Sequence, residues 1–166
     1  MILRLTLSLP DDITYVRTAR LLTRTLLSHH KVLREDIEDV ETIIDELCSN
    51  VLRHAESEKR CFLVIVEYFP ELATIDIKDT GKGFDVNDIP LVGTIRPDFN
   101  GGERVGGFGL ILVRMLSTRL EFHVSDPEGT AVHAEKRLRY ETLAAKREAK
   151  DMDKHPHGGA DISLET

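Results

Sequence analysis

The chain has 166 residues, of which 41% are hydrophobic, and a formal net charge of -7. This length and apolar content suit one globular domain with its own core. The negative net charge argues against direct binding to nucleic acid, because sequence-independent binding to phosphates requires many clustered Lys and Arg side chains.

The cysteines and the hydropathy of the chain exclude further classes of protein. Cys48 and Cys61 form neither a C-x-x-C pair nor a pattern with histidines at metal-ligand spacing, so a disulfide framework is not indicated. The N-terminal apolar stretch is too short for a signal peptide, and no run of about 18 apolar residues could span a membrane. The sequence therefore predicts a soluble, cytoplasmic protein that does not associate with membranes.

The first third of the chain predicts a strand and two helices. In "ILRLTLSL" four leucines alternate with polar residues, which indicates a strand with one buried face. Pro10 and the two aspartates after it end this strand and can open a helix, which apolar spacing extends from Ile13 to about His30. A second amphipathic helix is predicted from Asp36 to Ala55, with acidic residues near its start, where the helix dipole favours them.

The remainder predicts two hairpins separated by a long loop and a helix. "CFLVIVEYF" and "LATIDIKD" form the first hairpin, and "RLEFHVSDPEGTAVHAEKRL" forms the second. Residues 86–105 show neither the two-residue period of a strand nor the 3.6-residue period of a helix, which is typical of a functional lid or a disordered loop. The segment "GGFGLILVRMLSTR" that follows is predicted to be a helix. We expect one domain over residues 1–140 and a charged, partly disordered extension over 141–166, with one short helix to about Met152.

Two glycine clusters follow predicted strand or loop ends, and neither fits the common phosphate-binding motifs. "DTGKGF", at Asp79 to Phe84, lacks the G-x-x-x-x-G-K-[ST] spacing of a P-loop. The dinucleotide fingerprint G-x-G-x-x-G also fails, because Val86 and Leu112 stand at the third-glycine positions of the two clusters.

A polar ridge lies along the second predicted helix. Glu46, Asn50 and His54 are spaced four residues apart, which places them on one helical face beside an apolar stripe. A carboxylate next to a side-chain amide suits a general base beside a magnesium ligand, because Mg²⁺ prefers oxygen donors and keeps waters and substrate phosphates.

Taken in order, Glu46-x-x-x-Asn50, Asp79-x-Gly81-x-Gly83 and Gly107-x-Gly109-Leu110 resemble the three motifs of the GHKL ATP-binding superfamily. The segment "IDELCSNVLRHA" resembles its anti-sigma factor serine kinase branch. The absence of a phosphoacceptor-histidine hairpin is in keeping with the same branch. The resemblance implies a Bergerat-type α/β two-layer sandwich, with a mixed, mostly antiparallel sheet, helices on one face and a lid at about 86–105.

The resemblance also implies a role for each motif residue. Asp79 would accept the adenine amino group, with Gly81 and Gly83 letting the backbone pass close to the base. Asn50 would hold Mg²⁺ against the phosphates of ATP, and Glu46 would be the catalytic base.

The second glycine cluster would hold the phosphates. There, Gly107, Gly109 and Leu110 would wrap them at a helix N-terminus, which favours anions. Arg104, in the lid, would contact the γ-phosphate.

By the same resemblance the chain would be an ATP-dependent serine/threonine protein kinase that regulates transcription in stress response or sporulation signalling. It would sequester a sigma factor and phosphorylate an antagonist of the STAS type, and it would be a homodimer. Two alternatives remain: a switch kinase that acts on a STAS scaffold without holding a sigma factor, and a non-catalytic ATP-dependent binding module. Each motif alone could also be an ordinary turn or a solvated helix face.

Overall fold

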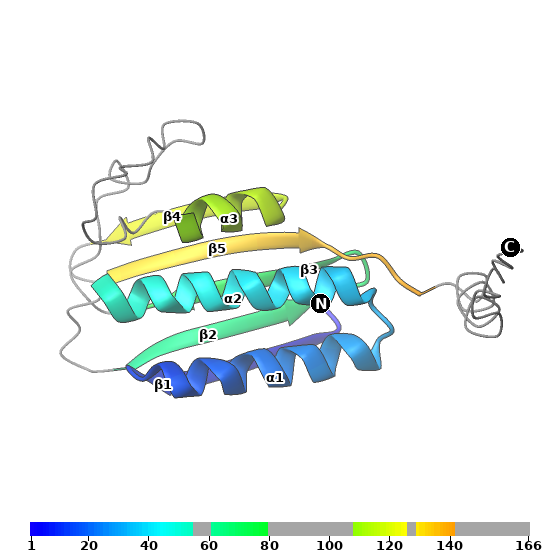
Figure 1. Cartoon of the computed structure of the whole chain (residues 1–166), viewed down its shortest axis with the longest axis horizontal. Helices are drawn as coiled ribbons and strands as arrows, with labels where there is room; N and C mark the ends of the chain where they lie inside the picture. Colours follow the sequence, from blue (N-terminus) through cyan, green and yellow to red (C-terminus); the bar gives the residue numbers. More distant parts are fainter. Residues whose placement is uncertain (55–60, 80–107, 126–128, 142–166) are drawn as a thin grey trace, which may run out of the picture.

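The structure, a computed structural model, describes residues 1–54, 61–79, 108–125 and 129–141. These residues form a five-stranded sheet and three helices (Figure 1). The elements in chain order are β1 (Leu3–Pro10), α1 (Ile13–His29), α2 (Arg34–His54), β2 (Cys61–Tyr68), β3 (Leu72–Lys78), α3 (Phe108–Leu116), β4 (Arg119–Ser125) and β5 (Gly129–Arg137).

All predicted strands and core helices are present, with shifts at their ends. The second helix begins at Arg34 rather than Asp36, and α3 is shorter than the apolar run predicts. Pro10 is the last residue of β1, and Asp12 caps α1 by accepting hydrogen bonds from the backbone amide and the hydroxyl of Thr14 at 2.8 and 2.7 Å. The lid at 86–105 and the helix expected to about Met152 lie outside the described residues.

The sheet has the order β1-β2-β3-β5-β4, and all four pairings are antiparallel. The expectation of a mostly antiparallel sheet is confirmed, and no parallel pair occurs among the described strands. All three helices lie on one face of this sheet, with α2 between α1 and α3 (Figure 1). The result is the predicted two-layer sandwich.

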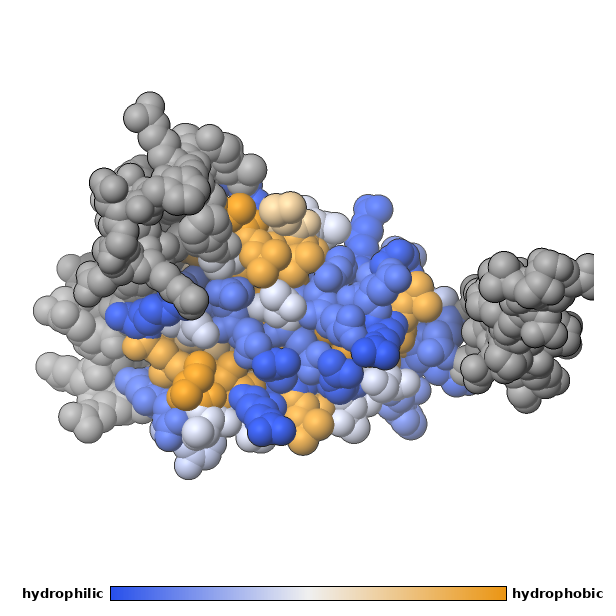
Figure 2. All heavy atoms as spheres, in the orientation of Figure 1, coloured by the Kyte–Doolittle hydropathy of each residue, from blue (hydrophilic) through white to orange (hydrophobic). Residues whose placement is uncertain are grey.

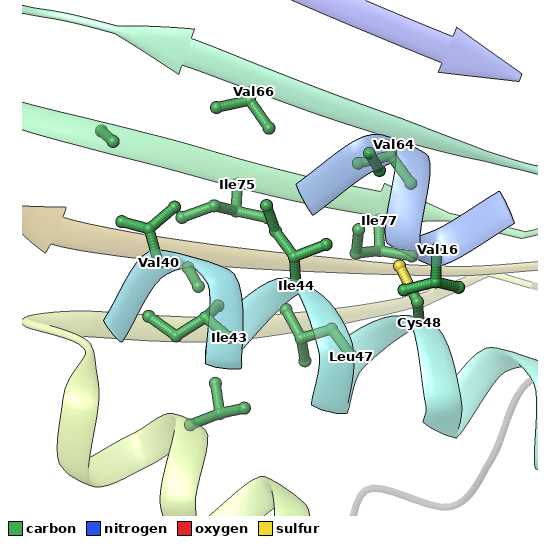
Figure 3. Close-up of a cluster of buried hydrophobic side chains, with 14 of the residues drawn as sticks. Val16, Val40, Ile43, Ile44, Leu47, Cys48, Val64, Val66, Ile75 and Ile77 are labelled. Carbon is green, nitrogen blue, oxygen red and sulfur yellow. The ribbon is translucent and has the colours of Figure 1, made fainter. Parts of the chain in front are cut away.

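The core fills the space between α2 and the central strands (Figure 3). Period-two alternation sends Val64 and Val66 of β2, and Ile75 and Ile77 of β3, toward the helices, and all four are buried. The buried stripe of α2 packs on them and consists of Ile37, Val40, Ile43, Ile44, Leu47, Cys48 and Val51. Burial also raises the pKa of the Cys48 thiol to about 12, so this thiol stays protonated at neutral pH.

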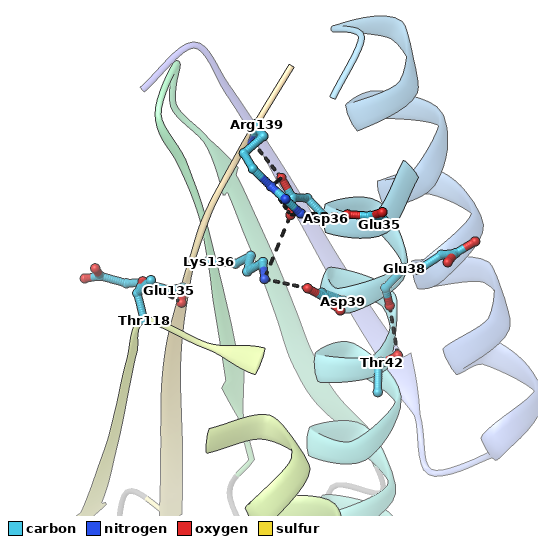
Figure 4. Close-up of polar contacts among 9 residues, drawn as sticks. All are labelled: Glu35, Asp36, Glu38, Asp39, Thr42, Thr118, Glu135, Lys136 and Arg139. Atoms are coloured by element: carbon cyan, nitrogen blue, oxygen red, sulfur yellow. Dashed lines mark hydrogen bonds and ion pairs between the residues drawn. The ribbon is translucent and has the colours of Figure 1, made fainter. Parts of the chain in front are cut away.

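A charge cluster around the buried carboxylate of Asp36 ties the start of α2 to β5 and the chain just after it (Figure 4). Asp36 accepts a hydrogen bond from the backbone amide of Arg139 at 2.6 Å and contacts its guanidinium at 2.8 Å. Lys136 lies 2.5 Å from Asp39. These contacts fix α2 lengthwise on the sheet, which sets where its functional face lies.

Candidate active site

α2 carries the two polar residues at the centre of the predicted site. Glu46 and Asn50 lie one turn apart and are half-buried, whereas Ile43 and Leu47 beside them are buried in the core. For Glu46 and Asn50 the structure therefore has the polar ridge beside a buried stripe that the spacing predicts, whereas the side chain of His54 lies outside the described part.

The Glu46 carboxylate lies against the first turn of α3. A Cβ added to Gly109 would lie 2.1 Å from Glu46 Oε2 and 3.0 Å from its Cδ. Gly109 and Glu46, from the third and the first of the predicted motifs, are thus in direct contact. Leu110, the next residue of that motif, is partly buried and packs against the hydrophobic core.

Asn50 has an unsatisfied polar atom. Its Nδ2 is buried, and no hydrogen-bond partner for it occurs in the described part of the chain. Buried amide groups nearly always have a partner, so this amide has capacity for a ligand. Because an amide presents an oxygen and a nitrogen on opposite sides, the same side chain can offer an oxygen to a cation such as Mg²⁺. The free donor fits a contact with a phosphate oxygen, and the magnesium role of Asn50 stays a prediction.

Asp79 follows the last residue of β3 and is 7% exposed. It stands two residues after Ile77, so it belongs to the strand face that packs under the helices. The end of β3, the end of α2 and the start of α3 lie at the same end of the molecule (Figure 1). The fold thereby brings the described parts of the three motifs to one end of the sandwich.

The other predicted site residues lie outside the described residues. These are Gly81 and Gly83 in the first glycine cluster, Arg104 in the predicted lid and Gly107 in the second cluster. Their roles stay predictions.

A cleft of about 600 Å³ opens between α1 and α2, and Glu46 is part of its lining. The wall formed by α1 carries Arg17, Arg20 and Arg24. The spacing of three and four residues puts all three on one face of the helix, a signal that was present in the sequence and that motif reasoning missed. Glu46 therefore borders this cleft as well as the first turn of α3.

Ion pairs cross the floor of this cleft. Arg20 Nη1 lies 2.5 Å from Asp45 Oδ2, and Arg24 Nε donates to Glu41 Oε1 at 2.9 Å. Partial burial raises the pKa of Asp45, the adjacent Glu46 adds to the rise, and Arg20 opposes it. The arginines therefore offset part of the negative charge that α2 concentrates beside Glu46.

The surface around the cleft alternates between apolar and polar zones (Figure 2). Exposed apolar side chains gather over α3, at Leu112 and Met115, and over α1, at Ile13 and Leu21, with a polar band over α2 between them. In the described portion, no helix is long and apolar enough to cross a membrane, and no three His, Cys, Asp or Glu side chains are arranged to hold a metal ion.

Comparison with known proteins identifies the family of the chain. Residues 9–136 match the histidine kinase-like ATPase domain family, and the chain belongs to that family. Within it, the similar curated proteins are serine-protein kinases, which places this chain in the serine/threonine kinase class.

Two such relatives are named serine-protein kinase RsbW. The one from Listeria monocytogenes is 28% identical over 136 residues, covering 78% of this chain and 83% of the relative. The one from Staphylococcus aureus is 32% identical over 112 residues, covering 64% of this chain and 70% of the relative.

A solved structure shares the fold. The crystal structure of the RsbU and RsbW domains of a Mycobacterium tuberculosis protein superposes with a TM-score of 0.61 at 18% identity, covering 83% of this chain and 32% of that chain. The predicted Bergerat-type α/β architecture is therefore confirmed.

Proposed function

We propose that this chain transfers the γ-phosphoryl group of ATP to a serine or threonine of a STAS-domain antagonist, and that it also sequesters a sigma factor. The observation that carries the proposal is the meeting of three motif residues at one end of the fold. There, the Glu46 carboxylate lies beside Gly109, and one turn further along α2 the buried amide of Asn50 lacks a partner in the described region.

In this proposal Glu46 is the general base. Its carboxylate accepts the proton of the attacking hydroxyl while that oxygen bonds to the γ-phosphorus, and the bond from the γ-phosphorus to the bridging oxygen breaks to release ADP. Asn50 would hold Mg²⁺, which when bound neutralises charge on the phosphates. Asp79, Gly81 and Gly83 would hold the adenine, and Arg104, Gly107, Gly109 and Leu110 the phosphates.

The similarity to serine-protein kinases supports a protein hydroxyl as the acceptor, and the family resemblance implies the two partners. The polar cleft between α1 and α2 leads to Glu46, so a folded protein could present a hydroxyl there. Phosphorylation of the antagonist would prevent it from displacing the sigma factor, so the ATP level would control transcription. We propose that the chain works as a cytoplasmic homodimer.

The test is a phosphorylation assay with γ-labelled ATP, Mg²⁺ and the STAS protein encoded nearest to this chain. Wild type should label a serine or threonine, and Glu46→Gln should lower kcat by about 10²- to 10⁴-fold, the usual contribution of a general base. Glu38→Gln is the matched control, because Glu38 is an exposed carboxylate on the same helix, and it should retain wild-type activity.

Binding measurements separate this proposal from the alternatives. Asp79→Asn should lose ATP affinity, and normal binding by that variant would show that the nucleotide site is misassigned. Capture of a sigma factor without labelling of any STAS protein would support a binding module. Labelling of a STAS protein with no sigma factor bound would support a switch kinase.

A further inference from the structure

Gly109 occupies a position where a side chain would overlap the Glu46 carboxylate. Its added Cβ would lie 2.1 Å from Oε2 and 3.0 Å from Cδ of Glu46, but 3.6 Å from Cβ, which is ordinary van der Waals contact. Within the described part of the chain, the conflict therefore involves the end of the glutamate side chain and not its base.

The backbone at Gly109 does not require glycine. The residue is in the helical segment of α3, and its φ lies outside the left-handed region. In such a place alanine stabilises a helix better than glycine does. The surroundings of Gly109 offer a reason for glycine, because among the described residues the nearest atoms belong to Glu46.

Both helices are held in place, so neither can move apart to make room. Ile43 and Leu47 anchor α2 on either side of Glu46, and Val113 anchors α3 one turn after Gly109; all three are buried. A methyl group at position 109 would therefore displace the flexible carboxylate rather than the helices.

We propose that Gly109 is a positioning residue for Glu46. By lacking a side chain, it leaves the carboxylate a place against the first turn of α3. The inference rests on the proposed role of Glu46 as the base. On this inference Gly109 has a second role besides letting the backbone approach the phosphates. Its missing side chain makes space for the carboxylate that receives the hydroxyl proton.

The direct test is Gly109→Ala in the full chain. We expect kcat to fall by about 10- to 100-fold, because displacing a reacting group by about 1 Å can reduce the rate by about two orders of magnitude. The midpoint of chemical unfolding should be equal to that of wild type or higher, because alanine favours the helix. Met115→Ala is the control on α3, since Met115 is 72% exposed, and it should change neither quantity.

A double-mutant cycle with Glu46→Asp provides the discriminating result. Aspartate is one methylene shorter, so its carboxylate ends short of the new methyl group. In the Glu46→Asp background, Gly109→Ala should lower kcat by less than about threefold, because residues in contact have non-additive effects. A crystal structure of Gly109→Ala should show the Glu46 carboxylate displaced and the α3 backbone unmoved.

The outcomes separate this inference from the proposed function. The positioning role is overturned if the losses in kcat multiply in the double variant, or if α3 is displaced while Glu46 stays in place. Either result would leave the proposed kinase activity standing, provided that Glu46→Gln is inactive. A fully active Glu46→Gln overturns the proposed base, and the role of Gly109 with it.

Discussion

His133 lies between two carboxylates on the face of the sheet opposite the helices. Its Nδ1 is 2.9 Å from Asp76 Oδ1 on β3, and its Nε2 is 3.3 Å from Glu135 Oε1 on its own strand. Burial disfavours the imidazolium, but the hydrogen bonds to Asp76 and Glu135 outweigh burial and raise the pKa of His133. The protonated histidine thus bridges two neighbouring strands.

This arrangement predicts a pH-dependent contribution to stability. The folded-state pKa is raised above the ordinary value of 6.5, so the stabilisation is complete below that pH and is lost as pH rises through the folded-state pKa. The difference in unfolding free energy between wild type and His133→Gln should therefore shrink as pH increases from below 6.5 through the raised folded-state pKa of His133. Urea denaturation across this range measures it.

Asp76→Asn provides the control for His133. It removes the carboxylate on β3, so the pH dependence contributed by His133 should be smaller in that background. An undiminished pH dependence in Asp76→Asn would mean that the β3 carboxylate does not stabilise the imidazolium.

At the level of elements, α2 is held at its start by a carboxylate that is buried in the fold. Asp36 is 1% exposed and bonds to the backbone and side chain of Arg139, with Lys136 4.0 Å away (Figure 4). Burial tends to raise the pKa of Asp36, but the bonds to Arg139 dominate and lower it. The contribution of Asp36 to stability is therefore present above its unfolded-state pKa and is lost as pH falls through the folded-state value.

Asp36→Ala should consequently lower the unfolding free energy by about 1 to 3 kcal/mol, because the buried carboxylate's bond to the Arg139 backbone amide and its contact with the exposed guanidinium are both lost. Glu38→Ala, on the same helix, should lower it by less than about 0.5 kcal/mol, because its pair with Arg34 is exposed. Guanidinium unfolding compares the two. Equal losses would show that the cluster does not anchor α2.

At the level of the whole molecule, one core joins the helix layer to the sheet. Ile44 of α2 is fully buried and lies next to Ile75 and Ile77 of β3 (Figure 3). Because α2 also carries Glu46 and Asn50, the packing that stabilises the fold is the packing that sets the site.

Ile44→Ala should lower the unfolding free energy by about 2 to 5 kcal/mol, the range for removing a large buried aliphatic side chain. Leu21→Ala is the matched control, since Leu21 is an aliphatic residue of α1 that is 60% exposed, and its loss should stay below about 1 kcal/mol. Thermal or urea unfolding measures both. A small effect of Ile44→Ala would mean that the two layers are not joined there.

Local periodicity determined most of the elements. Alternating leucines predicted β1, and helical spacing predicted α1 and α2, because these patterns repeat along the chain with the geometry of each element. The same spacing placed Glu46 beside Asn50. Helix ends were less predictable: Leu33, just before α2, donates to the carbonyl of Arg139, and Thr118, just after α3, donates to that of Glu135, contacts that no local pattern encodes.

The sequence by itself therefore determined the elements, their buried faces and the motif residues that define the family. Only the tertiary structure decided that the Glu46 carboxylate fills the space left open by Gly109, that Asp36 reaches Arg139, and that His133 joins two carboxylates. Those contacts join Glu46 to Gly109, Asp36 to Arg139 and Asp76 to His133, pairs far apart in the chain. They exist only once strand order and helix packing bring distant segments together, and chain spacing carries no information about them.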